Sequence, residues 1–433
     1  LGSLPLAVTA PFFAEPESEQ PGSGELLVLS IDPLACKGCG ICSQTCPAAA
    51  MEAAQRTPEA VAAARQSRST WELLPASAAA TVARVRQHPD VDAMAGPLLS
   101  RVGVPVLGSG DGGEPGSGAR LALRMTLAAM EAHQAGVFAE FLAQVQTVQQ
   151  QITALIRESL AGALPADDLD ALARGLESTD SRQADLSVFI GEADNAIGSS
   201  VDAAKLHRLV ELARGLADLA WRLEEGRQGF GRSRVGLVLS AGSAAEWAGG
   251  FPHNPFTGPV VVDSTGDGAQ LAAGLLEGQL RQTTDDAVLL RKARLEIEHP
   301  AEATRSWAQL EALRWQELSL EEKARCPVML LAGDSNTLGE RGLSQLAAVL
   351  GGELPLKALV FADLDLGLAV PPEVELPAAT APDTNANLAL LTLSRRNASM
   401  AQTSIGKPAH FQESLEQVIS GQGPALLHVH APS

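Results

Sequence analysis

The chain has 433 residues and a formal net charge of −19. This length is enough for two or three domains with substantial cores. Apolar residues make up 45% of the chain, which predicts a globular protein and excludes a largely disordered one. The acidity argues against a nucleic-acid partner, because such binding neutralises phosphates with basic side chains. It fits a basic redox partner or a solvated acidic surface, and the solvated surface is the simpler interpretation.

No uninterrupted apolar stretch is long enough to span a bilayer, so we expect no membrane span. The apolar run at 4–13 has no basic segment ahead of it and does not resemble a secretory signal. Four of the five cysteines lie within one short run, as expected of metal ligands in a reducing compartment. We therefore expect a cytoplasmic protein. A first residue other than Met is consistent with a piece of a longer polypeptide.

The first part of the chain contains an acidic stretch rich in Pro, Gly and Ser at 15–25, which predicts a linker. An apolar run at 26–32 then predicts a short strand. After the cysteines, the Ala-rich segment 48–66 predicts a small helix. The β-branched run 102–107 predicts a strand that ends in a Gly-rich loop.

The cysteine run reads Cys36-Lys-Gly-Cys39-Gly-Ile-Cys42-Ser-Gln-Thr-Cys46-Pro. Its spacing, C-x2-C-x2-C-x3-C-P, is the one by which bacterial-type ferredoxins hold iron–sulfur clusters. Glycines between the cysteines let backbone N–H groups approach the sulfides. A zinc loop or a disulfide knot fits this spacing poorly. The run therefore predicts an electron carrier with one cluster, with 4Fe-4S as the favoured type and these four cysteines as metal ligands.

The fourth ligand is open at this point. In two-cluster ferredoxins the fourth cysteine of each run ligates the cluster of the other run, and this chain has one run. Cys46 can close a single cluster, or Cys326 or a partner chain can supply the ligand, or the centre can be a three-iron cluster. Cys326 begins an apolar run, where a free cysteine is usually a small hydrophobic residue.

The rest of the chain contains two regions with different hydrophobic patterns. Residues 119–231 carry apolar side chains three to four positions apart with charges between them, which predicts a helical block. Beyond it, short apolar runs alternate with helical segments, which predicts an α/β domain with a doubly wound parallel sheet. Residues 234–242 predict a buried strand followed by a Gly turn. We expect further strands at 260–263, 328–333, 358–362 and 426–429, and helices at 266–297, 338–350 and 408–420.

Ligands in such sheets bind at the carboxyl ends of the strands. The residues there are Gly242-Ser243, Gly333-Asp334 and Ala362-Asp363, which are therefore candidate site residues. His428 and His430 on the last strand are two positions apart and could bind a metal. Without a carboxylate at compatible spacing, ordinary strand histidines are the simpler interpretation.

Three stretches resemble the C-terminal half of pyruvate:ferredoxin oxidoreductase, a member of the 2-oxoacid:acceptor oxidoreductase family. Residues 31–40 resemble its second cluster run. Leu330-Leu-Ala-Gly333-Asp334 resembles its thiamine diphosphate strand, and residues 401–433 resemble its last strand, helix and strand. The resemblance implies a ferredoxin-like cluster module followed by a thiamine-diphosphate-type doubly wound parallel sheet, with the block at 119–231 as a large helical insertion.

This chain departs from the family at the magnesium site. The family carries Gly-Asp-Gly and a later Asn for the Mg²⁺ that holds the diphosphate. Here Asp334 is retained, Ser335 replaces the second Gly, and no Asn follows at the expected distance. Asn336 could stand in, although a turn role is commoner for such an Asn. A hard cation needs several oxygen ligands, so the loss of one weakens Mg²⁺ and diphosphate binding.

A second departure concerns the family's cluster nearest thiamine. Its four cysteines correspond here to Ser109, Gly112, Ser243 and Ser433. Hydroxyl groups and glycine cannot replace thiolate as ligands for iron, so this cluster should be absent. The resemblance therefore implies a degenerate domain that keeps the fold, with thiamine diphosphate and Mg²⁺ unlikely as cofactors.

Together these observations lead to the hypothesis of an iron–sulfur electron-transfer subunit or region of a larger oxidoreductase, not catalytic alone. The resemblance implies an oligomeric complex with a redox partner protein or further subunits, flavoprotein modules among them. One alternative is the catalytic part of an active 2-oxoacid:ferredoxin oxidoreductase, and another is an interaction scaffold with a structural cluster. The expected domains are an N-terminal extension (1–25), the iron–sulfur module (26–66), a connecting segment (67–105) and the thiamine-type domain (106–433) interrupted by 119–231.

Overall fold

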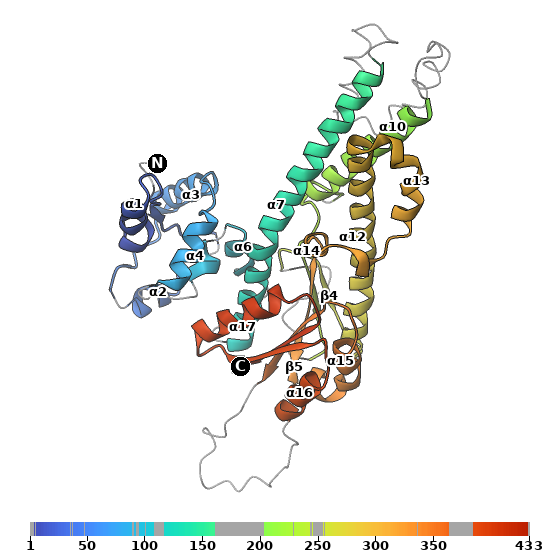
Figure 1. Cartoon of the computed structure of the whole chain (residues 1–433). Helices are drawn as coiled ribbons and strands as arrows, with labels where there is room; N and C mark the ends of the chain where they lie inside the picture. Colours follow the sequence, from blue (N-terminus) through green and yellow to red (C-terminus); the bar gives the residue numbers. More distant parts are fainter. Residues whose placement is uncertain are drawn as a thin grey trace. The chain divides into compact units, whose positions relative to one another are not determined.

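Figure 1 shows the computed structural model of the chain, which contains two compact units, Leu1–Val104 and Pro105–Ser433. None of the described helices combines the length and apolarity that a membrane crossing requires. The structure describes residues 4–160, 203–362 and 384–431, apart from short gaps at 5, 35, 37, 47, 89–90, 92–94, 100, 108–116, 228, 243–244, 246–253, 255 and 336.

The first unit is mainly helical. Its longest helix begins at Pro58 because the Thr57 hydroxyl accepts the N–H of Ala60 at 3.2 Å, and because proline suits the first helical position. The elements are β1 (Leu6–Ala7), the π-helix η1 (Ala10–Ala14), α1 (Glu15–Glu19), β2 (Leu27–Val28), α2 (Ile41–Thr45), α3 (Pro58–Glu72), α4 (Ala79–Gln87), α5 (Ala95–Leu99) and α6 (Gly103–Leu107), which crosses the boundary.

The structure corrects several sequence predictions in this unit. The strand at 26–32 is reduced to the two residues of β2, which pair antiparallel with β1. The stretch 15–25 begins with a helix, α1. The helix predicted at 48–66 begins only at Pro58 and continues to Glu72.

The strand predicted at 102–107 is wrong, because Gly103–Leu107 forms helix α6. Pro105 explains the difference. Proline has no N–H to give to a sheet ladder, but it is tolerated in the first turn of a helix, where that N–H has no partner anyway. A short apolar run cannot distinguish the two structures by its pattern alone.

The second unit contains a six-stranded parallel sheet with the strand order β4-β3-β5-β6-β8-β7. This confirms the α/β class. The elements are α7 (Gly118–Leu160), α10 (Ala203–Glu224), β3 (Val235–Leu239), β4 (Val260–Val262), α12 (Gly268–Glu298), α13 (Pro300–Glu311), η3 (Trp315–Glu317), α14 (Leu320–Ala324), β5 (Val328–Asp334), the π-helix η4 (Thr337–Arg341), α15 (Leu343–Leu350), β6 (Lys357–Ala362), α16 (Thr384–Leu393), β7 (Ser399–Ser404), α17 (Pro408–Ser420) and β8 (Ala425–His430).

Helices cover both faces of the sheet. Helices α7 and α17 contact each other and lie on one side of it, and α12 and α15 lie on the other (Figure 1). Alternate residues of the central strands turn toward α12, α15 and α16, as the two-residue period of a strand requires. The buried cluster on that face includes Val238, Leu331, Val360 and Leu426 from the strands and Leu276, Leu346 and Leu388 from the helices.

The helical block is confirmed for its described part. Helices α7 and α10 are joined by residues that lie outside the described ones, and they pack against each other and against α12. Figure 1 shows α7 and α12 extending well beyond the sheet. The buried side chains that join the three helices include Phe141, Val145, Ile152, Leu209, Leu216, Leu219 and Leu290.

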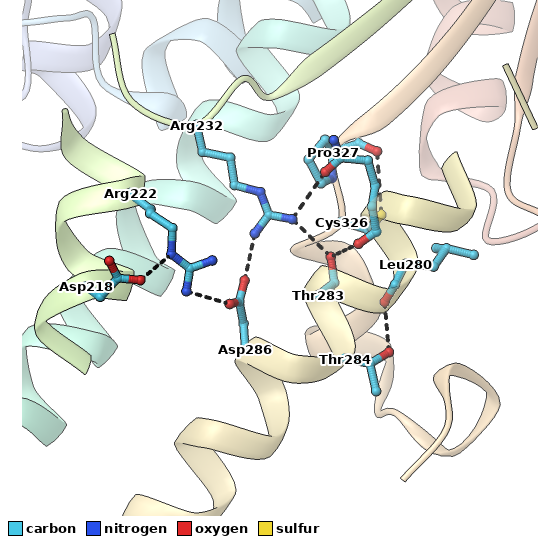
Figure 2. A network of polar contacts seen from close by, with 10 residues as sticks. Asp218, Arg222, Arg232, Leu280, Thr283, Thr284, Asp286, Cys326 and Pro327 are labelled. Atoms are coloured by element: carbon cyan, nitrogen blue, oxygen red, sulfur yellow. Dashed lines mark hydrogen bonds and ion pairs between the residues drawn. The ribbon is translucent and has the colours of Figure 1, made fainter. Parts of the chain in front are cut away.

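A buried polar network ties this helical block to the sheet domain (Figure 2). The carboxylate of Asp286 on α12 accepts the Nη1–H of Arg232 at 2.7 Å and the Nη2–H of Arg222 at 3.4 Å. Arg222 also forms an ion pair with Asp218. Burial raises the pKa of Asp286 more than the two guanidinium groups lower it. The carboxylate therefore depends on these partners to be tolerated in the interior.

Glu322 on α14 gives the unit a pH-dependent contact. Its carboxylate accepts Arg291 Nε–H at 2.7 Å and Nη2–H at 2.6 Å, and it also accepts the Ser319 N–H. The pKa of Glu322 is lowered from its ordinary value of 4.5 to about 2, and the hydrogen bonds from Arg291 are the largest cause. A depressed carboxyl pKa stabilises the fold above the unfolded value, and this contribution is lost as the pH falls through the folded value.

We predict that Glu322→Gln lowers the free energy of unfolding at pH 7 by roughly 1 kcal/mol, because it removes a partly exposed ion pair. The variant should also lose less stability than the wild type between pH 4.5 and pH 2. Denaturant unfolding at pH 7, 4.5, 3.5 and 2.5 measures both effects. Glu298→Gln, at an exposed position, is the control and should follow the wild type. Parallel pH profiles for Glu322→Gln and the wild type would contradict the prediction.

Candidate functional site

The cysteine run forms a surface loop of the first unit. Before it, the Leu34 N–H donates to Asp32 Oδ1 at 2.8 Å and the Cys36 N–H donates to the Asp32 carbonyl at 2.9 Å, which fixes the turn into the run. Cys42 lies on α2. Cys36, Cys39 and Cys42 are exposed and Cys46 is half-buried, so all four predicted ligands lie on one short surface segment.

Two glycines set the backbone of this loop. Gly38 has a φ of +68° and Gly40 a φ of +76°, in the left-handed region that other residues seldom adopt. No atom lies within 4 Å of the position of a Cβ on Gly38, so the backbone conformation alone selects glycine there. Cys39 therefore lies between two residues whose backbone conformation favours glycine, in a loop of the kind that a cluster-binding run needs.

Cys46 receives a hydrogen bond that favours its thiolate. The N–H of Ala50 donates to Cys46 Sγ at 3.4 Å. This bond, more than the opposing effect of burial, lowers the pKa of the Cys46 thiol. The thiolate is the form that ligates metal, so this hydrogen bond favours the form of Cys46 that a metal would bind.

The run fits an iron–sulfur cluster by its donor atoms and its backbone. Its thiols are the soft donors that iron–sulfur clusters take, and its glycines permit the close approach of backbone to sulfide. Within the described residues no three His, Cys, Asp or Glu side chains are grouped so that they could hold a metal ion. The sulfurs therefore lie in sequence along the loop without being closed around a common centre.

Cys326 lies in the second unit and has a different environment. Its side chain is buried, its Sγ donates to the Pro327 carbonyl at 3.6 Å, and it contacts Thr283 (Figure 2). Burial raises the pKa of Cys326 to about 11. A buried thiol with a raised pKa is a poor iron ligand, so the structure favours a packing role for this residue.

The carboxyl edge of the sheet holds the candidate thiamine residues that the structure describes. Asp334 ends β5, and its Oδ1 accepts the Thr337 N–H at 2.8 Å and the Thr337 hydroxyl at 2.9 Å. A Cβ on Gly242 would meet Asp334 Oδ2 at 2.7 Å, so the turn after β3 comes close to this carboxylate. Asp334 therefore already serves as a cap for the turn into η4. The other candidates, Ser109, Gly112, Ser243, Asn336, Asp363 and Ser433, lie outside the described residues.

Asp263, which follows β4, is a carboxylate at this edge that our sequence analysis missed. It is buried and accepts hydrogen bonds from the N–H groups of Thr265, Gly266 and Gly268 at 2.8 to 3.1 Å. Burial alone would raise the pKa of Asp263, but these hydrogen bonds together lower it. The sequence Asp-Ser-Thr-Gly-Asp-Gly after an apolar run could have drawn attention to Asp263. The hydrogen bonds that Asp263 accepts show that it holds the loop in which α12 begins.

The two strand histidines have separate neighbours. His428 is buried, and its Nδ1 lies 3.4 Å from Gln402 Nε2. His430 Nδ1 lies 3.3 Å from the Ala362 carbonyl, to which it can donate. Burial lowers the pKa of His428, with a smaller contribution from His430. These contacts fit ordinary strand histidines held in a sheet.

Comparison with known proteins bears on the cysteine run directly. Residues 29–52 match the 4Fe-4S binding domain family, Fer4. This segment carries a 4Fe-4S-type sequence. It contains all four clustered cysteines and both left-handed glycines, and it supports an iron–sulfur cluster and an electron-transfer role for the first unit. No curated protein matches the chain.

Among solved structures, the chain is similar to 2-oxoglutarate:ferredoxin oxidoreductase from Magnetococcus marinus, solved with 2-oxoglutarate, coenzyme A and succinyl-CoA bound. The identity is 12%, and the TM-score is 0.29. The match covers 51% of this chain and 59% of the other, so the chain spans less than two thirds of that protein. A TM-score this low does not establish a shared fold.

Proposed function

We propose that this chain is an iron–sulfur electron-transfer subunit or region of a larger oxidoreductase. Cys36, Cys39 and Cys42 would hold one 4Fe-4S cluster, with Cys46 as the fourth cysteine ligand. The observation that carries the proposal is the match of the whole cysteine run to a 4Fe-4S binding domain. When bound, the cluster would supply reversible one-electron chemistry.

The exposure of the run supports a role in electron exchange. Cys36, Cys39 and Cys42 are exposed, so a cluster on them would lie at the surface of the first unit. A partner protein could approach such a cluster directly. The physiological donor and acceptor would then be chosen by the residues around the run.

Metal analysis of the anaerobically purified chain tests the cofactor. We expect four iron and four acid-labile sulfide per chain, the content of the cluster type that the matched family binds. Zinc in place of iron, without sulfide, would contradict the proposal and favour a structural metal loop.

We further propose that residues 106–433 form a degenerate thiamine-diphosphate-type domain, interrupted by 119–231, that acts as a scaffold. The parallel sheet and the position of Asp334 at the end of β5 are compatible with this assignment. Asp334 is already engaged by Thr337. Serine or glycine stands at all four positions where the family that the sequence resembles carries the cysteines of its thiamine-side cluster.

We predict that the chain does not bind thiamine diphosphate with Mg²⁺. The reason is electrostatic, because two phosphates without a complete metal site lack their main counter-charge, and Mg²⁺ depends on several correctly placed oxygens. Calorimetric titration of the full chain with thiamine diphosphate and MgCl₂ should show no heat of binding. A micromolar dissociation constant would contradict the prediction. Pyruvate-dependent reduction of a viologen dye by the chain would contradict the scaffold assignment as well.

One alternative keeps some support. The retained Asp334, at the carboxyl end of a central parallel strand and beside the Gly242 turn, is where a thiamine-dependent 2-oxoacid oxidoreductase would need a magnesium ligand. In that case this chain would be the catalytic C-terminal part of such an enzyme, and the calorimetric titration separates the two hypotheses.

A further inference from the structure

The segment that follows Cys46 directs backbone N–H groups toward the sulfur of this residue. The Ala50 N–H donates to Cys46 Sγ at 3.4 Å. This bond is the largest cause that lowers the pKa of the Cys46 thiol, and the N–H groups of Ala48, Met51 and Ala49 lower that pKa further. Successive N–H groups that converge on one atom form a concavity that binds negative charge. We call these four residues the N–H nest.

Ala49 gives the N–H nest its backbone conformation. Among the residues that the structure describes, it is the one residue other than glycine with a positive φ, +49°. The Cβ of an alanine crowds the backbone in this left-handed region, so the surrounding structure must hold Ala49 there. Backbone strain of this kind is common at functional sites. It therefore points to a use for the turn after Cys46.

The turn itself begins where α2 ends. Helix α2 ends at Thr45, and the Ala49 N–H donates to the Cys46 carbonyl at 3.1 Å, which closes a tight turn from Cys46 to Ala49. The turn bends the chain so that the N–H groups that follow lie beside the sulfur of the residue where the turn starts. The positive φ of Ala49 is thus part of what brings donors and sulfur together.

The position of the N–H nest suits an effect on a cluster. It lies within residues 29–52, the segment that matches the 4Fe-4S binding domain family. Cys46 is half-buried, whereas the three other cysteines of the run are exposed. A hydrogen bond is stronger where water is partly excluded. Its effect on Cys46 should therefore exceed that of a similar bond to an exposed sulfur.

Few charged side chains of the matched segment compete with the N–H nest. Residues 29–52 contain three, Asp32, Lys37 and Glu52. Reduction of an iron–sulfur cluster adds one electron, and hydrogen bonds to the sulfurs are among the factors that set its potential. N–H groups directed at a ligand sulfur stabilise the more negative, reduced form more than the oxidised form. They therefore raise the reduction potential.

We propose that Ala49 is a positioning residue for the cluster, and that its left-handed backbone raises the reduction potential by holding the N–H nest against Cys46 Sγ. This inference rests on the proposed function and names what tunes its redox couple. The effect comes from the backbone, so the side chain at position 49 matters through the φ that it allows.

Substitutions at position 49 test the proposal without a change of charge. Ala49→Gly allows the left-handed φ without steric cost, so it should keep the wild-type reduction potential and iron content. Ala49→Val places a β-branched side chain where a positive φ is strongly disfavoured, so the N–H groups should turn away from the sulfur. Reduction should then become about tenfold less favourable, a shift of about 59 mV to more negative potential for a one-electron couple.

A second variant removes the donor itself. Proline has no N–H, so Ala50→Pro should shift the potential in the same direction as Ala49→Val. Ala54→Pro is the matched control, because Ala54 is an exposed residue of the same irregular segment and lies outside the N–H nest. It should keep the wild-type potential.

The readouts are the midpoint potential and the iron and acid-labile sulfide per chain, measured on the anaerobically purified full chain. Electron paramagnetic resonance follows the cluster while dithionite and ferricyanide set the potential. If Ala49→Val loses its iron, the potential of Ala50→Pro decides. Loss of iron from both would assign the N–H nest to cluster retention and overturn its role in tuning. An equal shift in Ala49→Gly and Ala49→Val would overturn the role of φ.

The wild-type chain separates this inference from the proposed function. A chain without iron or sulfide would refute the proposed cluster itself. A reversible couple that keeps the same potential in Ala49→Val and Ala50→Pro would refute the tuning and leave the electron-transfer role intact.

Discussion

Cys39→Ala is expected to reduce the iron and acid-labile sulfide of the anaerobically prepared chain to about a tenth of the wild-type content or less. The iron that Cys39 would bind needs a thiolate ligand, and alanine offers no donor atom in its place. The cluster should therefore be lost. Cys39 also lies between Gly38 and Gly40, which both have a positive φ. A neighbouring cysteine could take its place only if the backbone of this loop changed.

Cys326→Ser is the matched control for this prediction. It removes a thiol of the same chain, but one that is buried in the second unit and has a pKa of about 11. Its iron and sulfide should equal those of the wild type. Circular dichroism of both variants checks that the second unit remains folded. Wild-type iron in Cys39→Ala, or loss of iron in Cys326→Ser, would refute the ligand assignment.

Asp286→Ala is expected to lower the free energy of unfolding of the second unit by about 3–5 kcal/mol, the usual cost of removing one partner from a buried ion pair. The side chain of Asp286 is 4% exposed and that of Arg232 is 9% exposed, so water cannot replace the lost carboxylate. Among the residues that the structure describes, Arg232 would keep its weaker contacts to Gln279 and Thr283 at 3.3 to 3.4 Å.

The control for this substitution is Asp218→Ala. Asp218 forms an ion pair with Arg222 in the same network, but its side chain is 55% exposed. Its removal should change the free energy of unfolding by no more than about 0.5 kcal/mol, as is usual for exposed pairs four residues apart on a helix. Denaturant unfolding of the full chain measures both variants. Equal effects of the two substitutions would contradict the assignment of Asp286 as the buried anchor of the network.

The sheet could be predicted from the sequence because its central strands are buried on both faces. Val328–Asp334 and Lys357–Ala362 are nearly continuous apolar runs, which parallel strands between two helical layers require. The edge strand β7 is different. It reads Ser399-Met-Ala-Gln-Thr-Ser404, is half exposed and has no apolar pattern, so only the family resemblance pointed to it.

The parts that sequence analysis missed depend on contacts between distant residues. The pairing of Arg232 with Asp286 joins positions 54 residues apart, and neither neighbourhood indicates it. In the first unit, Glu25 accepts hydrogen bonds from Ala78 and Thr81 across more than fifty residues. Patterns of period two or 3.6 describe which face a residue occupies, but they do not say which distant residue meets it.

The cluster site is the opposite case. The predicted ligands are close in sequence, and their spacing is itself the chemical constraint, so the sequence alone is enough to predict them. The fourth ligand stays a prediction, because it depends on how the loop closes around the cluster.

The electron-transfer role is tested most directly by a redox titration of the anaerobically purified full chain, followed by electron paramagnetic resonance. We predict a single reversible one-electron couple within the range of iron–sulfur clusters, about −700 to +450 mV, with an amplitude that matches the iron content. A full content of iron and sulfide with no reversible couple in that range would contradict the role and identify the cluster as structural.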